Sequence, residues 1–329
     1  MDEVAPALQD LLRRETGGDV AVDRVVALSG GAASLTFAVD ARRDGSAWPL
    51  IFQRAGAEEA AVGALAKSVQ ARLQVRARQA GLPVAAVVAV ASPADGLGDG
   101  FVMERIEGES LAPRYLRLPD YAAARAAMVG QCATALARLH AIGPGEFADL
   151  PLPAASPAAA RTAMYELYRG FGVDSPVFDL AFAWLAERLP DEPPAALVHG
   201  DFRSGNFIVG PEGLRAILDW ELAHVGHPME DVGWLCTNTW RFGAWQRPVG
   251  GFGAREAFHD AYVAAGGTLD RELARVFELW ASLRWGVMCL QLAHAHLSGV
   301  RPSVELAAIG RRVSETEIDI LHILKHGEV

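Results

Sequence analysis

The chain has 329 residues, which is enough for one large domain or two of ordinary size with a substantial core. Hydrophobic residues make up 51% and charged residues 21%, so the composition is that of a globular chain and excludes a disordered one. The net charge of -10 argues against a nucleic-acid partner, because a phosphate backbone requires a basic face.

The N-terminal segment is acidic and amphipathic, and it lacks the basic region and apolar stretch of a signal peptide. The longest apolar run, residues 285–293, is too short to span a membrane. Cys132, Cys236 and Cys289 are far apart and form no C-x-x-C pair, which is typical of buried thiols in a reducing compartment. We therefore expect a soluble cytoplasmic protein with no membrane partner.

The first hundred residues predict a mostly antiparallel sheet that carries one long helix. Three strand-like runs, separated by Gly-containing or charged turns, occupy residues 22–54. Residues 58–81 are rich in Ala, Gln and Arg and end on a Gly before Leu-Pro, which predicts a helix with a clear stop. Two further strand-like runs follow at residues 85–91 and 100–108.

The rest of the chain is predicted to be helical, apart from one short hairpin at residues 206–219. The expected helices are 121–142, 159–170, 175–189, 229–242, 255–265, 271–297 and 304–325. The Pro/Ala-rich segment 150–160 is interpreted as a surface loop, because the helices on both sides of it are amphipathic.

The stretch NFIVGPEGLRAILDW alternates about Pro-Glu-Gly and predicts the hairpin. With Glu212 and Gly213 as the central turn residues, Asn206 and Asp219 would face each other across the two strands, with Cβ atoms roughly 5 Å apart. An amide oxygen and a carboxylate at that spacing can share Mg²⁺, which takes few protein oxygens and leaves the rest of its shell to water and phosphate.

Asp201 stands in the polar loop HGDFRSGN, five residues before Asn206. Its carboxylate can orient a hydroxyl and accept its proton while a metal neutralises phosphate charge. A base with two metal ligands is the arrangement that phosphoryl transfer requires. Arg203, two residues after the base, is a candidate for contacting the transferred phosphate, and an ion pair with a carboxylate is the other interpretation.

HGDFRSGN followed by ILDWE resembles the aminoglycoside phosphotransferase and choline kinase superfamily, relatives of protein kinases. The spacing from Asp201 to Asn206 is similar to that of the kinase catalytic loop, and Asp219 stands where the family has its second metal-binding Asp. The resemblance covers nearly the whole chain. Within this superfamily, the chain is more specifically similar to bacterial phosphotransferase-family proteins, whose domain also occurs fused to acyl-CoA dehydrogenases.

This resemblance implies an α+β, two-lobed, protein-kinase-like fold. Residues 1–107 would form a small antiparallel-sheet lobe that binds the nucleotide, and residues 108–329 a larger, mostly helical lobe with the catalytic loop and the acceptor site. Mg²⁺ and ATP, with GTP as the other candidate nucleotide, would bind between the lobes.

Two main-chain segments of the first lobe are candidate nucleotide contacts. The turn SGGAAS would lay backbone N–H groups of Ser29, Gly30 and Gly31 over the phosphates, although a plain hairpin has the same pattern. The segment MERIEG resembles the hinge between the lobes and would offer main-chain groups from Glu104 to Ile106 to the adenine.

The chain departs from the family pattern at two positions in the first lobe. The third strand of the family ends in a Lys or Arg that grips phosphate, whereas here Gln53 stands at that place with Arg54 beside it. Strand alternation lets only one of them face the cleft. Either Gln53 faces it and forms a hydrogen-bonded pair with Gln70 in place of the family's charge pair, or Arg54 faces it and is the candidate phosphate ligand. Gln70 replaces the usual Glu partner. The alternative function is therefore a catalytically weak nucleotide-binding module.

Three other residues near the loop have expected roles. His199 is expected to pack and hydrogen-bond the loop, and Asp231 is expected to anchor it. Glu221 either supports the metal or the substrate hydroxyl, or forms a structural salt bridge.

The helical lobe is predicted to bind a small-molecule hydroxyl acceptor. Its later helices are Trp-rich and largely apolar, which is typical of core and also of a pocket with few polar anchors. Polycationic aminoglycosides need clustered carboxylates, and no acidic cluster stands out, so we disfavour antibiotic modification. A separate interpretation makes four residues the transition-metal ligands of a hydrolase: His199, Asp201, His224 and His227.

Overall fold

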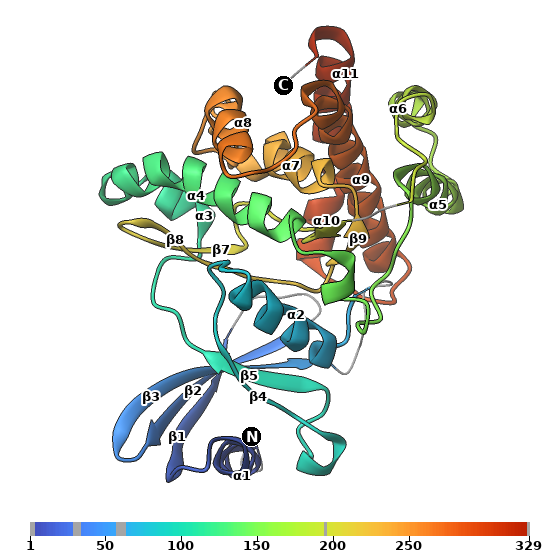
Figure 1. The fold of residues 1–329 in the computed structure, drawn as a ribbon. Coiled ribbons are helices and arrows are strands. Elements are labelled where there is room, and N and C mark those ends of the chain that lie inside the picture. The colour runs from blue at the N-terminus through green and yellow to red at the C-terminus, as the bar shows by residue number, and fades with distance from the viewer. Residues whose placement is uncertain (1–3, 29–33, 57–63, 194–195, 328–329) are drawn as a thin grey trace.

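A computed structural model gives the fold of this α+β protein (Figure 1). The described residues are 4–28, 34–56, 64–193 and 196–327. A five-stranded antiparallel sheet with two helices forms one part, and a larger set of helices forms the other. The predicted α+β class is confirmed.

The sheet has the strand order β1-β2-β3-β5-β4. Its strands are β1 (Val20–Ala27), β2 (Ser34–Arg43), β3 (Ser46–Ala55), β4 (Val87–Val90) and β5 (Gly100–Glu104). All neighbours are antiparallel, and the strands lie close to their predicted positions.

The two faces of the sheet pack on different helices, α1 (Val4–Thr16) and α2 (Lys67–Gln79). Phe52 belongs to the cluster that contains the buried leucines of α1, whereas Phe101 packs with Ala71 of α2. Because side chains alternate along a strand, even-numbered residues of β3 share the α1 face and odd-numbered ones the α2 face. Figure 1 shows α2 between the sheet and the helical part.

Helix α2 begins at Lys67, so the predicted helix 58–81 is too long at its N-terminal end, where residues 64–66 are not helical. Leu73 and Ala77 of α2 also belong to the large hydrophobic core of the helical part. The helix therefore joins the sheet to the rest of the protein.

The second part holds nine α-helices within the described residues. They are α3 (Ala112–Arg117), α4 (Ala122–His140), α5 (Pro157–Gly170), α6 (Pro176–Ala186), α7 (Met229–Cys236), α8 (Arg255–Ala264), α9 (Arg271–Leu297), α10 (Val304–Gly310) and α11 (Val313–His326). No helix in the described ranges combines the length and apolarity that crossing a membrane requires. All three cysteines are buried and unpaired.

Two predicted helices are shorter or broken. The segment 229–242 stops being α-helical at Cys236, because the backbone of Thr237 is extended, with ψ of 134°. The guanidinium of Arg241 donates to the Cys236 carbonyl (2.7 Å) and satisfies this helix end. The segment 304–325 breaks between α10 and α11, and each piece packs separately on α9. Hydrophobic periodicity continues through both breaks and does not reveal them.

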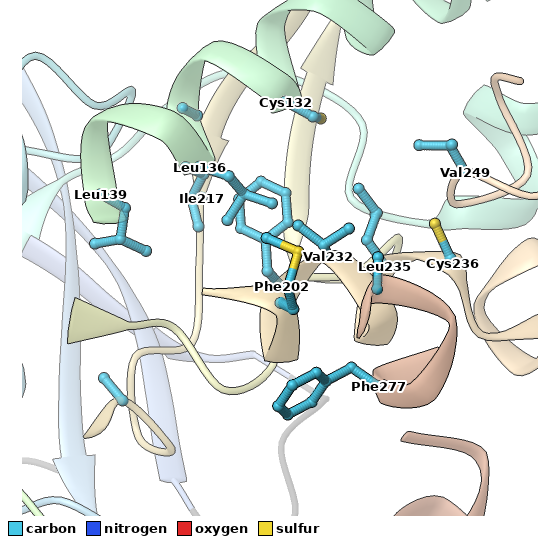
Figure 2. Packing of buried hydrophobic residues seen from close by; sticks show 14 of the residues in the cluster. Cys132, Leu136, Leu139, Phe202, Ile217, Val232, Leu235, Cys236, Val249 and Phe277 are labelled. Atoms are coloured by element: carbon cyan, nitrogen blue, oxygen red, sulfur yellow. The ribbon is translucent and has the colours of Figure 1, made fainter. Parts of the chain in front are cut away.

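Two short strand pairs position the polar loop that contains Asp201. The strands are β6 (Ala196–Val198) with β9 (His224–Gly226), and β7 (Phe207–Gly210) with β8 (Gly213–Ile217). The β6–β9 pair was not predicted, since three-residue strands show no useful alternation. Phe202, next to Asp201, is fully buried and lies among Leu136, Ile217 and Val232 (Figure 2). The loop is thus anchored in the core.

Candidate active site

The β7–β8 hairpin differs from its predicted register. Its turn residues are 211–212 and not 212–213, and β8 contains a bulge at Arg215. The amide of Leu218 donates to the main-chain carbonyl of Asn206 (2.8 Å), so Leu218 stands opposite Asn206, not Asp219. The prediction of direct cross-strand pairing between Asn206 and Asp219 is therefore wrong, because the turn lies one residue earlier than predicted and the bulge only partly offsets this shift.

Asp219 follows the hairpin in a left-handed conformation, with φ of 65°, which is uncommon for a residue other than Gly. Asp219 is exposed, but the surrounding protein removes part of the water around its carboxylate, and this desolvation raises its pKa. The carboxylates of Glu221 and Asp201 raise the pKa further, to about 7. In the described part of the chain no group donates a hydrogen bond to its carboxylate. A carboxylate that accepts no hydrogen bond from the described residues is a position suited to a cation.

The Asp201 carboxylate is held by three donors. Arg203 Nε and Trp234 Nε1 donate to its Oδ1 at 2.8 and 2.7 Å, and Asn206 Nδ2 donates to its Oδ2 at 2.6 Å. The residue is only 8% exposed. Both side-chain hydrogen bonds of Asn206 use its nitrogen, so its amide oxygen is left for another ligand.

Asp231, near the start of α7, anchors the catalytic loop as expected. Its carboxylate accepts the backbone amides of His199 (2.7 Å) and Gly200 (2.9 Å), and Nε2 of His140 donates to it at 3.2 Å. Burial by itself would raise the pKa of Asp231, but the hydrogen bond from His140 and the charges of the two histidines outweigh burial and lower it. The anchor is an ionised carboxylate with filled hydrogen-bonding positions.

His199 and Gly200 shape the loop locally. Nδ1 of His199 accepts the Asp201 amide (3.2 Å), while Nε2 donates to the Leu218 carbonyl (3.0 Å), and burial lowers the pKa of the ring. Gly200 has φ of 77°, and a Cβ there would lie 2.3 Å from the Leu222 carbonyl oxygen. The expected structural role of His199 is confirmed, and position 200 requires glycine.

The hydrolase interpretation receives no support from this geometry. His199 is occupied by the loop, and His224 hydrogen-bonds the Leu222 carbonyl and Glu230. His227 stacks on Phe277. Among the residues that the structure describes, no three His, Cys, Asp or Glu side chains form a group that could hold a metal.

Arg203 is engaged with the loop itself. Besides its ion pair with Asp201, its guanidinium carbon lies 4.2 Å from the ring centroid of Trp240. Of the two interpretations of Arg203, the geometry favours the ion pair with a carboxylate over a free phosphate contact.

Arg54 does not face the α2 side of the sheet, as its role in phosphate binding would require. Its guanidinium carbon lies 5.6 Å from the Phe37 ring, on the face that packs on α1. The parity of β3 is the reason, since Arg54 shares its face with Phe52 and leaves Gln53 on the α2 face.

The other predicted nucleotide contacts lie in or near the hinge and the Gly turn. The amide of Glu104 is occupied by the Ala86 carbonyl (2.9 Å). The amide of Ile106 donates to no group within the described ranges and is thus available to a ligand. Ser29, Gly30 and Gly31 lie outside the described residues.

Lys67, the first residue of α2, was missed by the sequence prediction. It is only 4% exposed, and its Nζ donates to Oε1 of Gln70 (3.1 Å). Gln70 was expected to pair with Gln53 of the third strand, but its partner is on its own helix. A lysine in the first turn opposes the helix dipole, but the predicted helix began at residue 58, so the sequence did not place Lys67 in a first turn.

These features define a protein of the phosphotransferase class. The sequence profile of the phosphotransferase enzyme family matches residues 24–281, most of the chain, and the protein belongs to this family. The predicted superfamily is confirmed.

Solved structures share the fold along almost the whole chain. One is a Ralstonia eutropha protein described as an aminoglycoside phosphotransferase, with TM-score 0.71, 18% identity and 95% of each chain covered. Another is a choline/ethanolamine kinase family protein from Mesorhizobium loti, with TM-score 0.61, 19% identity and coverage of 95% and 93%. These likenesses confirm the two-lobed protein-kinase-like fold.

Curated relatives match part of the chain. Acyl-CoA dehydrogenase family member 11 of Gallus gallus is 32% identical over 163 residues, and that of Mus musculus is 32% identical over 168 residues. The matches cover 46% and 47% of this chain but 20% and 21% of those proteins. The aligned part is about a fifth of the length of these relatives.

Proposed function

We propose that the protein is an ATP-dependent phosphotransferase that moves the γ-phosphate of Mg-ATP to a hydroxyl group of a small molecule. The proposal depends mainly on the carboxylate of Asp201, which accepts hydrogen bonds from three side chains, including Asn206. The charge of this carboxylate also raises the pKa of Asp219. Membership of the phosphotransferase family supports the same reaction class.

Asp201 is the proposed base. It orients the acceptor hydroxyl and accepts its proton as the acceptor oxygen bonds to the γ-phosphorus and the bond to the β–γ bridging oxygen breaks. Arg203, Trp234 and Asn206 fix the carboxylate in one orientation. A fixed base lowers the cost of reaching the reactive geometry.

Asn206 and Asp219 are the proposed Mg²⁺ ligands. The amide oxygen of Asn206 and the carboxylate of Asp219 accept no hydrogen bond within the described ranges, and oxygen donors of these types suit Mg²⁺. When bound, the ion supplies positive charge that neutralises the transferring phosphate.

Residues 1–107 are the proposed nucleotide lobe and residues 108–329 the proposed catalytic and acceptor lobe. The boundary agrees with the pairing of Glu109 and Val209, which exchange two backbone hydrogen bonds of 2.9 Å just after it. The free amide of Ile106 is the proposed contact for the nucleotide base.

The proposed acceptor site is a hollow of about 720 Å³ beside the catalytic loop. Phe242 in its wall lies 3.8 Å from where a Cβ at Gly205 would stand, which brings the hollow to the loop. The opposite charges that line this hollow offset one another, because Arg312 forms an ion pair with Glu315. A balanced surface favours a neutral or weakly charged alcohol over a polycationic aminoglycoside.

The second candidate is a catalytically weak nucleotide-binding module. Gln53 on the α2 face of β3 favours it, because the strand supplies no cation there. Intact Mg-ATP binding with little or no turnover would support this module over a kinase.

The deciding experiment is a screen of phosphate transfer to alcohols, sugars, amino alcohols and hydroxyacyl compounds, with ATP or GTP and with or without Mg²⁺. We expect transfer that needs Mg²⁺ and falls by roughly 10²- to 10⁴-fold in Asp201→Asn. Undiminished transfer in that variant would remove Asp201 from the base role.

A further inference from the structure

The α2 face of β3 has no positive side chain at its end. Gln53 occupies that place, and Arg54 points to the face that packs on α1. A triphosphate bound near Asp219 therefore needs a cation from another element.

Lys67 is held firmly beside the segment that follows Asp219. The carboxylate of Asp99 accepts the backbone amides of Lys67 (2.7 Å) and Ser68 (3.0 Å), which fixes the start of α2. The amide of Leu65 donates to the carbonyl of Glu221 (2.8 Å). These bonds join the beginning of α2 to the chain two residues beyond Asp219.

Among the residues that the structure describes, the ammonium of Lys67 has a single hydrogen-bond partner. It has three donors, and one of them is used by Gln70, which is itself fixed because its Nε2 donates to the Leu65 carbonyl (2.7 Å). Within the described ranges no carboxylate lies in ion-pair contact with Lys67. A buried ammonium with one neutral partner is costly, so this arrangement calls for an anion.

The surroundings of Lys67 place its charge at the proposed metal site. Burial lowers the pKa of Lys67, while the carboxylates of Glu221 and Asp219 act in the opposite direction. Burial also raises the pKa of both carboxyl groups, and Lys67 is the positive charge that most opposes this increase. The ammonium thus lies within electrostatic reach of Asp219.

We propose that Lys67 is the phosphate-binding cation of this protein and that Gln70 positions it, so that helix α2 supplies the charge that strand β3 lacks. The ammonium donates its free N–H groups to phosphate oxygens of the nucleotide beside the Mg²⁺ ligands. The inference rests on the proposed function, because it requires a nucleoside triphosphate at Asp219.

The test compares Lys67→Met with Arg72→Met by calorimetric titration with Mg-ATP and with adenosine. Arg72 is a matched control, because it lies on the same helix but pairs with Asp149 at the surface. Loss of charged hydrogen bonds to phosphate is expected to weaken Mg-ATP binding by roughly 10- to 100-fold in Lys67→Met and to leave adenosine binding unchanged. Arg72→Met should bind both ligands as the wild type does.

A second variant tests whether lost affinity follows from the missing charge or from a damaged fold. Adding Gln53→Lys to Lys67→Met returns a cation from the α2 face of β3 and should recover part of the lost Mg-ATP affinity. Wild-type affinity in Lys67→Met, or equal losses for Mg-ATP and adenosine, would overturn the role of Lys67 alone. Failure of the wild type to bind Mg-ATP would overturn the proposed function together with it.

Discussion

The catalytic loop and the nucleotide-facing side of the sheet differ in how completely they are held without a ligand. Asp201 has three donors, and Asp231 fixes the loop behind it through two backbone amides. On the α2 side of the sheet, the only side chain in the described part of the protein that holds the ammonium of Lys67 is the neutral Gln70. The loop is held without a ligand, whereas the proposed phosphate-binding side would be completed by the nucleotide. Substitutions in the loop should therefore cost more stability.

The largest effect is expected for Asp231→Ala. This change leaves two buried amides without an acceptor and His140 without its carboxylate, and should lower the free energy of unfolding by about 3–5 kcal/mol. Chemical denaturation measures it. Asp260→Ala, which removes an exposed ion pair with Arg271, is the control and should cost less than about 1 kcal/mol. Equal costs would show that the loop is not anchored by Asp231.

Gly200→Ala should cost about 2 kcal/mol of stability, because its left-handed backbone and the Leu222 carbonyl both exclude a side chain. The control is Gly130→Ala in the interior of α4, where a Cβ meets nothing within 4 Å. That change should increase stability by up to about 1 kcal/mol. Thermal unfolding of both variants would sharpen the contrast, and a neutral Gly200→Ala would contradict the close approach.

Asp219→Asn should increase the stability of the protein, in contrast to the two substitutions above. In the ligand-free protein at pH 8 it relieves repulsion from Glu221 and Asp201, and solvent screening limits the gain to about 1 kcal/mol. Mg-ATP should then stabilise the variant much less than the wild type. Asp44→Asn, also at a left-handed position, is the control and should change neither quantity. Full stabilisation of Asp219→Asn by Mg-ATP would contradict its role as a metal ligand.

The smallest effect concerns pH. Burial lowers the pKa of His199, so the folded protein keeps the ring neutral while the unfolded chain binds a proton below about pH 6.5. Stability should therefore fall as pH decreases from 7 to 6, with a contribution from His199 of up to about 0.7 kcal/mol. His199→Gln should lose this part of the slope in urea titrations at the two pH values. An unchanged slope would mean that His199 is charged in the folded state.

Local patterns predicted the parts of the site that are close in sequence. The spacing from Asp201 to Asn206 keeps both residues in one tight loop, so their hydrogen bond needs little from the rest of the fold. Asp231 was also predicted as an anchor, because a carboxylate at a helix start is suited to hold backbone amides. The strands of the sheet were predicted from their alternation and turn residues.

Prediction failed where the answer depended on pairing between distant segments. The turn lies one residue earlier than predicted, and the bulge in β8 only partly offsets this shift, so Asp219 is out of register with Asn206. The direction of Arg54 was decided by which face of β3 packs on α1, a contact formed by the first helix of the chain.

The amino-acid sequence by itself determined the family, the α+β class and which residues share the loop at Asp201, because these depend on residues near one another in the chain. Tertiary structure alone decided which cation faces the proposed metal site. Asp99 and Glu221, from two other segments, fix the start of α2 and with it the proposed position of Lys67. Such a position depends on how separate elements pack, and no local pattern encodes it.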